Sequence, residues 1–230
     1  MVIFASNAMD NRTNDSFSCI IFDMDGTLTR TNELIFESFN HVAEKYAGKR
    51  LSPKEIIALF GPPEEGGLSK VVGEDAVDDA LDDLCEYYQT NHSRLASLHP
   101  GIEAILQLLK SRGVKLAVFT GKGNRTARIT LNELRIASYF DLVVSGSDVV
   151  KHKPHHEGIT RVIEHFSLRP DEVLMVGDTV GDVKASRGAG VKVAAVLWDS
   201  YDRDSVLQAG ADYVFNDVNE MRRWFETHIN

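Results

Sequence analysis

Short apolar runs that end in turn residues recur along the chain and predict buried β-strands. Each run is three to six residues long. A continuous apolar run of this length, bounded by turn residues, is typical of a strand that is covered on both faces. The predicted strands are Cys19–Phe22, Lys115–Phe119, Leu142–Val144, Val173–Val176, Val191–Val196 and Asp212–Phe215.

The segments between these strands place apolar residues three and four positions apart, which predicts helices with one buried face. Because strands and helices alternate, the pattern favours an α/β fold. We expect a doubly wound, mostly parallel sheet with helices on both faces. The predicted helices are Ile102–Lys110, Arg125–Leu134, His156–Phe166 and Val183–Arg187.

The alternation is interrupted between residues 30 and 97. No convincing strand occurs in this interval or before Lys115, and we predict that the interval is wholly helical. The segment 61–67, Gly-Pro-Pro-Glu-Glu-Gly-Gly, is predicted to be a loop, and His99-Pro100-Gly101 is predicted to mark the return to the main domain. We therefore predict a core made of residues 17–29 and 98–230, with an inserted helical domain at 30–97. Its predicted helices are Glu33–Tyr46, Pro53–Phe60 and Asp75–Gln89.

Residues 1–16 are expected to lie outside this fold. Met1–Ala5 lacks the basic start of a signal peptide. Ser6, Asn7 and Ala8 are small residues of the kind left by an expression tag, and they precede a possible internal start at Met9. We predict a disordered or expression-derived N-terminal extension.

Composition narrows the class of protein. The 230 residues are 43% hydrophobic, which suits one large core with a smaller insert. The net charge of -9 argues against general affinity for nucleic acid or anionic membranes. Cys19 and Cys85 suggest neither a disulfide framework nor a zinc site, which favours a reducing compartment. No apolar run approaches the roughly 18 residues that span a bilayer, so we expect a cytoplasmic protein.

Two carboxylates follow the first predicted strand. The spacing of Asp23 and Asp25 leaves both near the carboxyl end of that strand, with Met24 pointing elsewhere. This edge of a parallel sheet is where ligands bind. Gly26 and Thr27 suit a tight turn whose backbone N–H groups can cradle phosphate oxygens. The ordinary structural alternative is an Asx turn followed by a helix cap.

Further polar side chains follow the later strands. Each alone has a simple structural explanation as a helix cap, a solvated lysine or a turn residue. Because the carboxyl ends of parallel strands share one edge of the sheet, their joint occurrence favours a functional site. They are Thr120, Gly121 and Lys122 after the second predicted strand, Lys153 after the third, and Asp178 and Asp182 after the fourth.

These residue types fit phosphate chemistry. Several neighbouring carboxylates repel one another, so some become protonated unless a cation lies among them. Oxygen donors favour Mg²⁺, which binds carboxylates, waters and a substrate phosphate oxygen. Lys153 and Thr120 can neutralise and orient the remaining phosphoryl oxygens. Asp23 is left to attack phosphorus and form an aspartyl phosphate, which predicts a Mg²⁺-dependent phosphatase for small phosphate esters.

The motifs also resemble those of a known family. Asp23 and Asp25 in a DxDGT segment, then Thr120, Lys153 and the GDxxxD segment at Gly177–Asp182, resemble the haloacid dehalogenase superfamily from about residue 18 to the end. The helical insert is similar to the cap domain of its phosphoglycolate phosphatase and β-phosphoglucomutase branch. We therefore call residues 30–97 the cap. The resemblance implies a Rossmann-like core with an inserted all-helical cap.

The resemblance implies a role for each site residue. Asp23 is expected to be the nucleophile, and Asp25 the general acid and then the general base. Lys153 is expected to bind phosphate and to restrain Asp23. The expected catalytic residues are Asp23, Asp25, Thr120 and Lys153; the expected phosphate-binding residues are Gly26, Thr27, Thr120, Gly121, Lys122 and Lys153.

The resemblance also implies the metal ligands. Asp178 is expected to bind Mg²⁺ directly, Asp182 to bind the ion or its waters, and Asp25 to bind it through its main-chain carbonyl. With Asp23, these residues form the expected metal set. The metal-independent dehalogenases lack the second aspartate, so Asp25 favours phosphate chemistry instead.

The loop at 61–67 is expected to reach over the reacting phosphate and to select the substrate. If Glu64 or Glu65 faces the site, the leaving group is expected to be neutral, hydroxylated or cationic rather than a second anion. This would argue against phosphoglycolate as the substrate, because its leaving group carries a second anion. The expected partner is a small phosphorylated metabolite, with no nucleic acid or membrane, and the protein is expected to be a monomer or a homodimer.

Other functions remain open alternatives. A sugar-phosphate mutase would need stronger exclusion of water, and no cap arginine for a second phosphate is identified. The Gly61-Pro62-Pro63 context also resembles pyrophosphatase members of the same branch. A phospho-signalling receiver would be shorter and would lack the helical insert. A non-catalytic phosphate-binding protein is disfavoured by the complete set of catalytic residues.

Overall fold

Six strands form one parallel sheet in the order β5-β4-β1-β6-β7-β8. The computed structural model describes residues 17–229, so the prediction for residues 1–16 lies outside the described part of the chain. The predicted α/β fold is confirmed, and all six predicted strands are present. Their bounds are β1 Cys19–Phe22, β4 Lys115–Phe119, β5 Leu142–Val144, β6 Val173–Gly177, β7 Lys192–Val196 and β8 Tyr213–Phe215.

The central strand β1 pairs with β4 along one edge and with β6 along the other, and a hydrophobic cluster covers each of its faces. Ile20 and Phe22 point to one hydrophobic cluster, and Cys19 and Ile21 point to the other. All four side chains are fully buried. This explains why the strand reads as a continuous apolar run rather than an alternating one.

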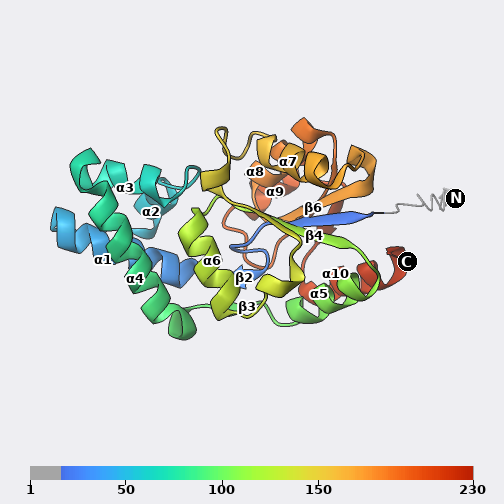
Figure 1. The fold of residues 1–230 in the computed structure, drawn as a ribbon, viewed down its shortest axis with the longest axis horizontal. Coiled ribbons are helices and arrows are strands. Elements are labelled where there is room, and N and C mark those ends of the chain that lie inside the picture. Colours follow the sequence, from blue (N-terminus) through green and yellow to red (C-terminus); the bar gives the residue numbers. More distant parts are fainter. Residues whose placement is uncertain (1–16, 230) are drawn as a thin grey trace, which may run out of the picture.

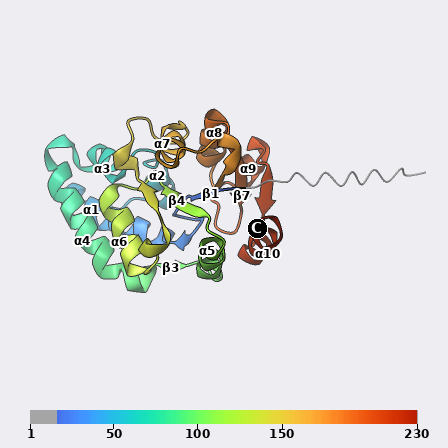
Figure 2. The same cartoon turned by 45° about the vertical axis from the view of Figure 1, so that its right-hand side comes forward.

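Helices cover both faces of the sheet. Helices α5, α6 and α10 contribute to one cluster, and α7, α8 and α9 to the other. Figure 2 shows α5 and α10 on one side of the sheet and α7 and α8 on the other. Helices α5, α6, α7 and α8 lie at or close to the predicted positions, whereas α9 and α10 were not predicted. The bounds are α5 Ile102–Ser111, α6 Asn124–Glu133, α7 Glu157–Phe166, α8 Val180–Ala189, α9 Arg203–Ala209 and α10 Val218–His228.

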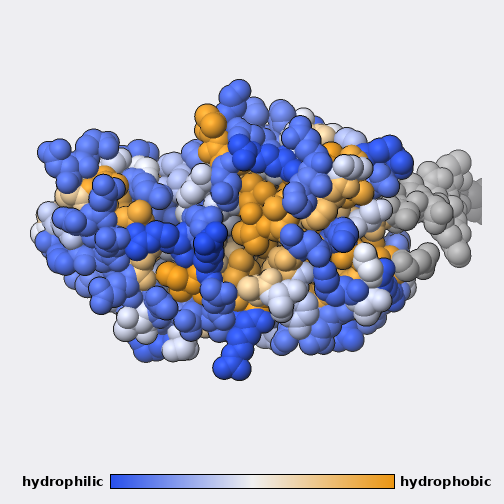
Figure 3. All heavy atoms as spheres, in the orientation of Figure 1, coloured by the Kyte–Doolittle hydropathy of each residue, from blue (hydrophilic) through white to orange (hydrophobic). Residues whose placement is uncertain are grey.

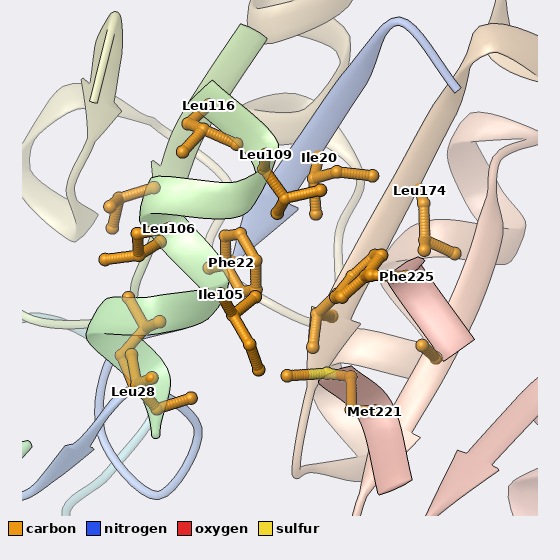
Figure 4. Close-up of a cluster of buried hydrophobic side chains, with 14 of the residues drawn as sticks. Ile20, Phe22, Leu28, Ile105, Leu106, Leu109, Leu116, Leu174, Met221 and Phe225 are labelled. Atoms are coloured by element: carbon orange, nitrogen blue, oxygen red, sulfur yellow. The ribbon is translucent and has the colours of Figure 1, made fainter. Parts of the chain in front are cut away.

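Close packing joins the sheet to the helices on the first face. Figure 4 shows Ile20 and Phe22 of β1 lying between Ile105 of α5 and Phe225 of α10. Phe225 is fully buried although its helix is close to the end of the described chain. This face of the core therefore depends on a helix that is distant in sequence from β1.

The cap contains four helices with a hydrophobic cluster of their own. They lie beyond the carboxyl ends of the strands (Figure 1). The separation of the clusters supports treating the cap as a unit, but its limits at residues 30 and 97 stay a prediction. The helices are α1 Asn32–Ala47, α2 Pro53–Ile57, α3 Glu64–Val72 and α4 Val77–Leu95.

The prediction of a loop over residues 61–67 was wrong in its second half, because α3 begins at Glu64. Pro63 is the N-cap residue, and Glu64 and Glu65 lie in the first turn, where acidic side chains favour a helix. Gly66 and Gly67 lower helix propensity and conceal this signal in the sequence. At Gly67 a Cβ atom would lie only 3.3 Å from Phe39 and Leu59 side-chain atoms, so close packing favours glycine.

The prediction that no strand occurs between residue 30 and Lys115 was also wrong. β2, Thr29–Arg30, pairs with β3, Ser97–Leu98, in an antiparallel ribbon at the two ends of the cap. Strands of two residues are too short to show a period-two pattern, so the sequence gives no signal for them.

Surface character differs across the molecule. Figure 3 shows mainly hydrophilic residues over the cap helices on one face, and apolar residues gathered between α6 and the sheet. No helix among residues 17–229 is both long and apolar enough to cross a membrane.

We expect Phe225→Ala to lower the free energy of unfolding by about 3–5 kcal/mol, because it leaves a cavity in a fully buried cluster. Leu207→Ala, at a side chain on α9 that is 44% exposed, should change it by less than about 0.5 kcal/mol. Urea unfolding followed by circular dichroism measures both values. Equal effects of the two substitutions would contradict the assignment of Phe225 to the core.

Candidate active site

Three neighbouring strands bring the predicted residues together. Asp23 directly follows β1, Thr120 follows β4, and Asp178 follows β6. β1 pairs in parallel with both β4 and β6, so the three strands end at one edge. The sheet grows outward in opposite directions from this point, and such a switch point is where open α/β sheets bind ligands.

A buried lysine lies between two carboxylates at this edge. The Nζ atom of Lys153 is 3.0 Å from Oδ1 of Asp23 and 2.6 Å from Oδ1 of Asp182. Both contacts are buried ion pairs. Burial acts to lower the pKa of Lys153, but Asp182 and Asp23 outweigh burial and hold that pKa above its usual value. Lys153 is therefore a cation that neutralises part of a carboxylate cluster.

The cluster contains more negative charge than Lys153 neutralises. Oxygen atoms of Asp23, Asp178 and Asp182 lie within 4.8 Å of one another, and all three residues are buried. Burial raises the pKa of Asp23 to about 7, against the opposing effect of Lys153. Burial and the charge of Asp23 also raise the pKa of Asp178 well above its usual value. Three buried oxygen donors with this excess charge fit a divalent cation.

The turn after β1 positions Asp178. Oγ1 of Thr27 donates a 2.9 Å hydrogen bond to Oδ1 of Asp178. A Cβ atom at Gly26 would lie 2.4 Å from Oδ2 of the same carboxylate, and the φ of Gly26 is +78°. Both the close approach and the left-handed backbone favour glycine at this position.

Asp182 has a second structural role besides its contact with Lys153. Its Oδ2 atom accepts hydrogen bonds from the backbone N–H of Thr179, at 3.0 Å, and from the Thr179 hydroxyl, at 2.6 Å. In return, the Thr179 hydroxyl accepts the N–H of Asp182, which makes a capping box at the start of α8. The spacing of the GDxxxD segment therefore places Asp182 so that it both caps the N-terminus of α8 and belongs to the carboxylate cluster.

Asp25 lies apart from the cluster, and two other side chains hold it. Its Oδ1 atom accepts a hydrogen bond from the Thr31 hydroxyl, and its Oδ2 atom is 3.3 Å from Nζ of Lys122. Lys122 is itself buried against the ring of Tyr88 on α4, with Nζ 4.7 Å from the ring centroid. The sequence analysis expects Lys122 to bind phosphate but does not predict its contacts with Asp25 and Tyr88, because these contacts depend on the position of the cap.

The turn after β4 presents Thr120 and Gly121 to the cavity. Oγ1 of Thr120 accepts the backbone N–H of Lys122 at 3.2 Å, which leaves the Thr120 hydroxyl proton available to a ligand. Gly26 and Thr27, by contrast, do not line the cavity as Thr120 does. Their predicted contacts with phosphate stay predictions.

A cavity of about 300 Å³ lies between the core and the cap. All four predicted catalytic residues line it, together with Gly121, Lys122 and Asp178. The cap contributes Asn32, Ile35, Phe39 and residues 59–64. A cavity of this size is within the range of small-molecule sites.

Glu64 links the cap to the core at the edge of this cavity. Its Oε2 atom accepts the backbone N–H of Gly123 at 2.6 Å, and its Oε1 atom accepts the Thr126 hydroxyl at 2.5 Å. Gly123 is the N-cap residue of α6 and has no side chain with which to cap it. The carboxylate therefore occupies the helix N-terminus, where negative charge is stabilised.

Two further contacts join α4 to α6. The hydroxyl groups of Tyr88 and Thr130 are 2.9 Å apart, and Arg125 donates a 2.6 Å hydrogen bond to Asp82. Figure 1 shows α6 beside the cap helix α4. Helix α6 is thus a major contact surface of the core for the cap.

Comparison with known proteins identifies the family of the chain. The family model for haloacid dehalogenase-like hydrolases matches residues 20–196. Pyrophosphatase PpaX from Bacillus cereus is 30% identical over 202 residues, which cover 88% of this chain and 93% of that protein.

Solved structures show the same fold. A protein described as a predicted phosphoglycolate phosphatase, from Haemophilus somnus, has a TM-score of 0.79 at 24% identity, covering 90% of this chain and 97% of its own. A haloacid dehalogenase-like family hydrolase from Streptococcus pneumoniae has a TM-score of 0.74 at 26% identity, covering 91% and 98%. With the family match over most of its length and the predicted motifs at one sheet edge, the chain belongs to the haloacid dehalogenase-like hydrolase family.

Proposed function

We propose that the protein is a Mg²⁺-dependent phosphatase that hydrolyses small phosphate monoesters through a phosphoaspartate at Asp23. One observation carries this proposal: Asp23, paired with Lys153, opens into the same cavity as Asp25 and Thr120. The cavity therefore combines a nucleophile, a proton donor and acceptor, and groups that bind phosphoryl oxygens. Membership of a hydrolase family supports it.

The first chemical step is attack by a carboxylate oxygen of Asp23 on phosphorus. The bond between phosphorus and the leaving oxygen breaks, and the carboxyl group of Asp25 gives its proton to that oxygen. The Thr31 and Lys122 contacts hold the two oxygens of Asp25 on the cavity side of the turn.

The second step returns the enzyme to its starting state. A water molecule attacks phosphorus and transfers a proton to the carboxylate of Asp25, and the bond between phosphorus and Asp23 breaks. Lys153 and the Thr120 hydroxyl bind phosphoryl oxygens in both steps, which keeps phosphorus in line with Asp23.

Asp23, Asp178 and Asp182 are the residues that would hold Mg²⁺, Asp182 directly or through water. When bound, the ion neutralises the cluster and polarises a phosphoryl oxygen. The main-chain carbonyl of Asp25 is the fourth proposed ligand. The side-chain carboxylate of Asp25 does not belong to the cluster, which agrees with the separate role proposed for this carboxylate in proton transfer.

Pyrophosphate hydrolysis is the second candidate function. It is favoured by the 30% identity with a protein named pyrophosphatase PpaX over most of both chains. The same nucleophile and metal residues would serve either substrate, so the distinction lies in the part of the cavity that receives the leaving group.

Asp23→Asn should lower kcat by at least about 10³-fold, because it removes the nucleophile. Acid quenching followed by mass spectrometry should detect a phosphoenzyme in the wild type and none in this variant. The control is Asp204→Asn, at an exposed position on α9, which should keep full activity. Activity retained in Asp23→Asn would overturn the proposed function.

Asp25→Asn should lower kcat by about 10²- to 10⁴-fold, since an amide neither donates nor accepts the required proton. Because the carboxyl group of Asp25 is not in the metal cluster and the substitution keeps the main-chain carbonyl, affinity for inorganic phosphate in the presence of Mg²⁺ should change little. Steady-state kinetics and isothermal titration calorimetry measure these quantities. An unchanged turnover number would remove Asp25 from the mechanism.

Mg²⁺ should stabilise the protein more at high pH than at low pH. The pKa of Asp23 is raised from 3.8 to about 7 in the folded chain. In the absence of a cation the folded state therefore holds a proton that the unfolded state releases, and stability falls as pH rises from about 4 to 7. A bound cation replaces that proton and removes this loss.

We therefore expect about 10 mM Mg²⁺ to raise Tm by about 3 °C or more at about pH 8, and by less at about pH 5.5. Asp178→Asn should reduce the increase at the higher pH, whereas Asp204→Asn should preserve it. Differential scanning fluorimetry with and without chelator gives the measurement. The absence of any Mg²⁺-dependent shift in the wild type would argue against the metal site.

A further inference from the structure

The cap side of the active-site cavity is mostly apolar. The polar side chains that the cap contributes to this cavity are Asn32 and Glu64. Phosphate binds at the opposite, core side in the proposed reaction, so the cap side is where the leaving group lies. The apolar residues that line this side form what we call the apolar wall. They are Ile35, Phe39, Leu59, Phe60, Pro62 and Pro63.

Two aromatic side chains at this cavity are exposed. Phe60 of the cap is 40% exposed, and Tyr201 of the core is 48% exposed. The Tyr201 ring also contacts Phe36 of α1, with ring centroids 6.1 Å apart. Exposed aromatic rings that line one cavity from both parts of the molecule can be covered by an apolar ligand, which removes their surface from water.

The cavity has few cations for a second anionic group. Among residues 17–229, its cationic lining consists of Lys122 and Lys153, with no arginine or histidine. Lys153 is paired with Asp23, and Lys122 lies 3.3 Å from Asp25. A second phosphate or a carboxylate against the apolar wall would therefore lose its hydration without gaining a free cationic partner, which is costly.

Glu64 adds a negative charge on the same side. The N-terminus of α6 would otherwise attract an anion, but the Glu64 carboxylate already accepts its Gly123 N–H and the Thr126 hydroxyl. Because these bonds hold Glu64 at the cavity lining, its charge repels a second anionic group of the substrate.

From this wall and this charge distribution we infer that the protein prefers phosphate monoesters of uncharged alcohols with an apolar body. Pyrophosphate and phosphoglycolate, which place a second anion in the leaving group, are the poorer substrates, so this inference favours the phosphate monoesterase over the second candidate function, pyrophosphate hydrolysis. Phe60 is a specificity-determining residue that contacts the leaving group. The inference rests on the proposed phosphatase function and narrows its substrate class.

The first test compares benzyl phosphate, glycerol 1-phosphate, phosphoglycolate and pyrophosphate with the purified full chain and Mg²⁺. The first three have primary alkyl leaving groups, so differences among them report recognition more than intrinsic reactivity. Pyrophosphate has a better leaving group, which works against the expected result. We expect kcat/KM for benzyl phosphate to exceed that for phosphoglycolate and for pyrophosphate by about tenfold or more.

The second test changes the wall. Phe60→Ser should lower kcat/KM for benzyl phosphate by about tenfold and lower that for glycerol 1-phosphate by less, because glycerol gains less from an apolar contact. Phe60→Lys should raise the ratio of pyrophosphate to benzyl phosphate activity above that of Phe60→Ser, since it supplies a cation. The matched control is Leu207→Ser, at a similarly exposed side chain on α9, which should change none of these values.

The outcomes distinguish a wrong substrate class from a wrong reaction. If pyrophosphate or phosphoglycolate equals or exceeds benzyl phosphate, the inferred substrate class is wrong while the phosphatase function stands. The same holds if Phe60→Ser leaves the ratio of benzyl to glycerol phosphate activity unchanged. If the wild type with Mg²⁺ releases phosphate from none of the four compounds, the proposed function itself fails.

Discussion

The buried ammonium group of Lys153, between the carboxylates of Asp23 and Asp182, is the contact on which the rest of the site depends. Removing one member of such a set leaves an uncompensated buried charge, which costs about 3–5 kcal/mol. Lys153 holds the side chain of Asp23, the proposed nucleophile, and neutralises the carboxylate of Asp182 in the first turn of α8. With Asp178 also present, one ammonium group cannot balance three carboxylates, so the cluster is electrically complete only with a cation or protons.

Much of this arrangement could be predicted from the sequence. Asp23, Thr120 and Asp178 each follow an apolar run, and in a parallel sheet all such positions meet at one edge. Predicting that these residues meet required only the positions of the strands and their parallel direction. The excess of acidic over basic groups at that edge then indicated a cation. The order of the strands in the sheet was not needed for this prediction. In the observed order, β1 lies between β4 and β6.

Other parts could not be predicted because they depend on how the cap sits on the core. The bonds from Glu64 to Gly123 and Thr126 join segments about sixty residues apart in sequence, and no local pattern encodes them. The same applies to Lys122, whose side chain meets Asp25 from one direction and Tyr88 from another. Helix α3 was concealed by its two glycines, and β2 and β3 by their length.

The short ribbon of β2 and β3 has a consequence for how such proteins diversify. Thr29 pairs with Leu98 and Arg30 with Ser97, so the chain leaves the core and returns to it at adjacent points. A segment inserted between adjacent points can be lengthened, exchanged or rebuilt without moving the strands that flank it. Since the residues proposed for chemistry lie in the core and the apolar wall lies in the cap, gene-level replacement of one segment can alter what is recognised while the reaction is inherited intact.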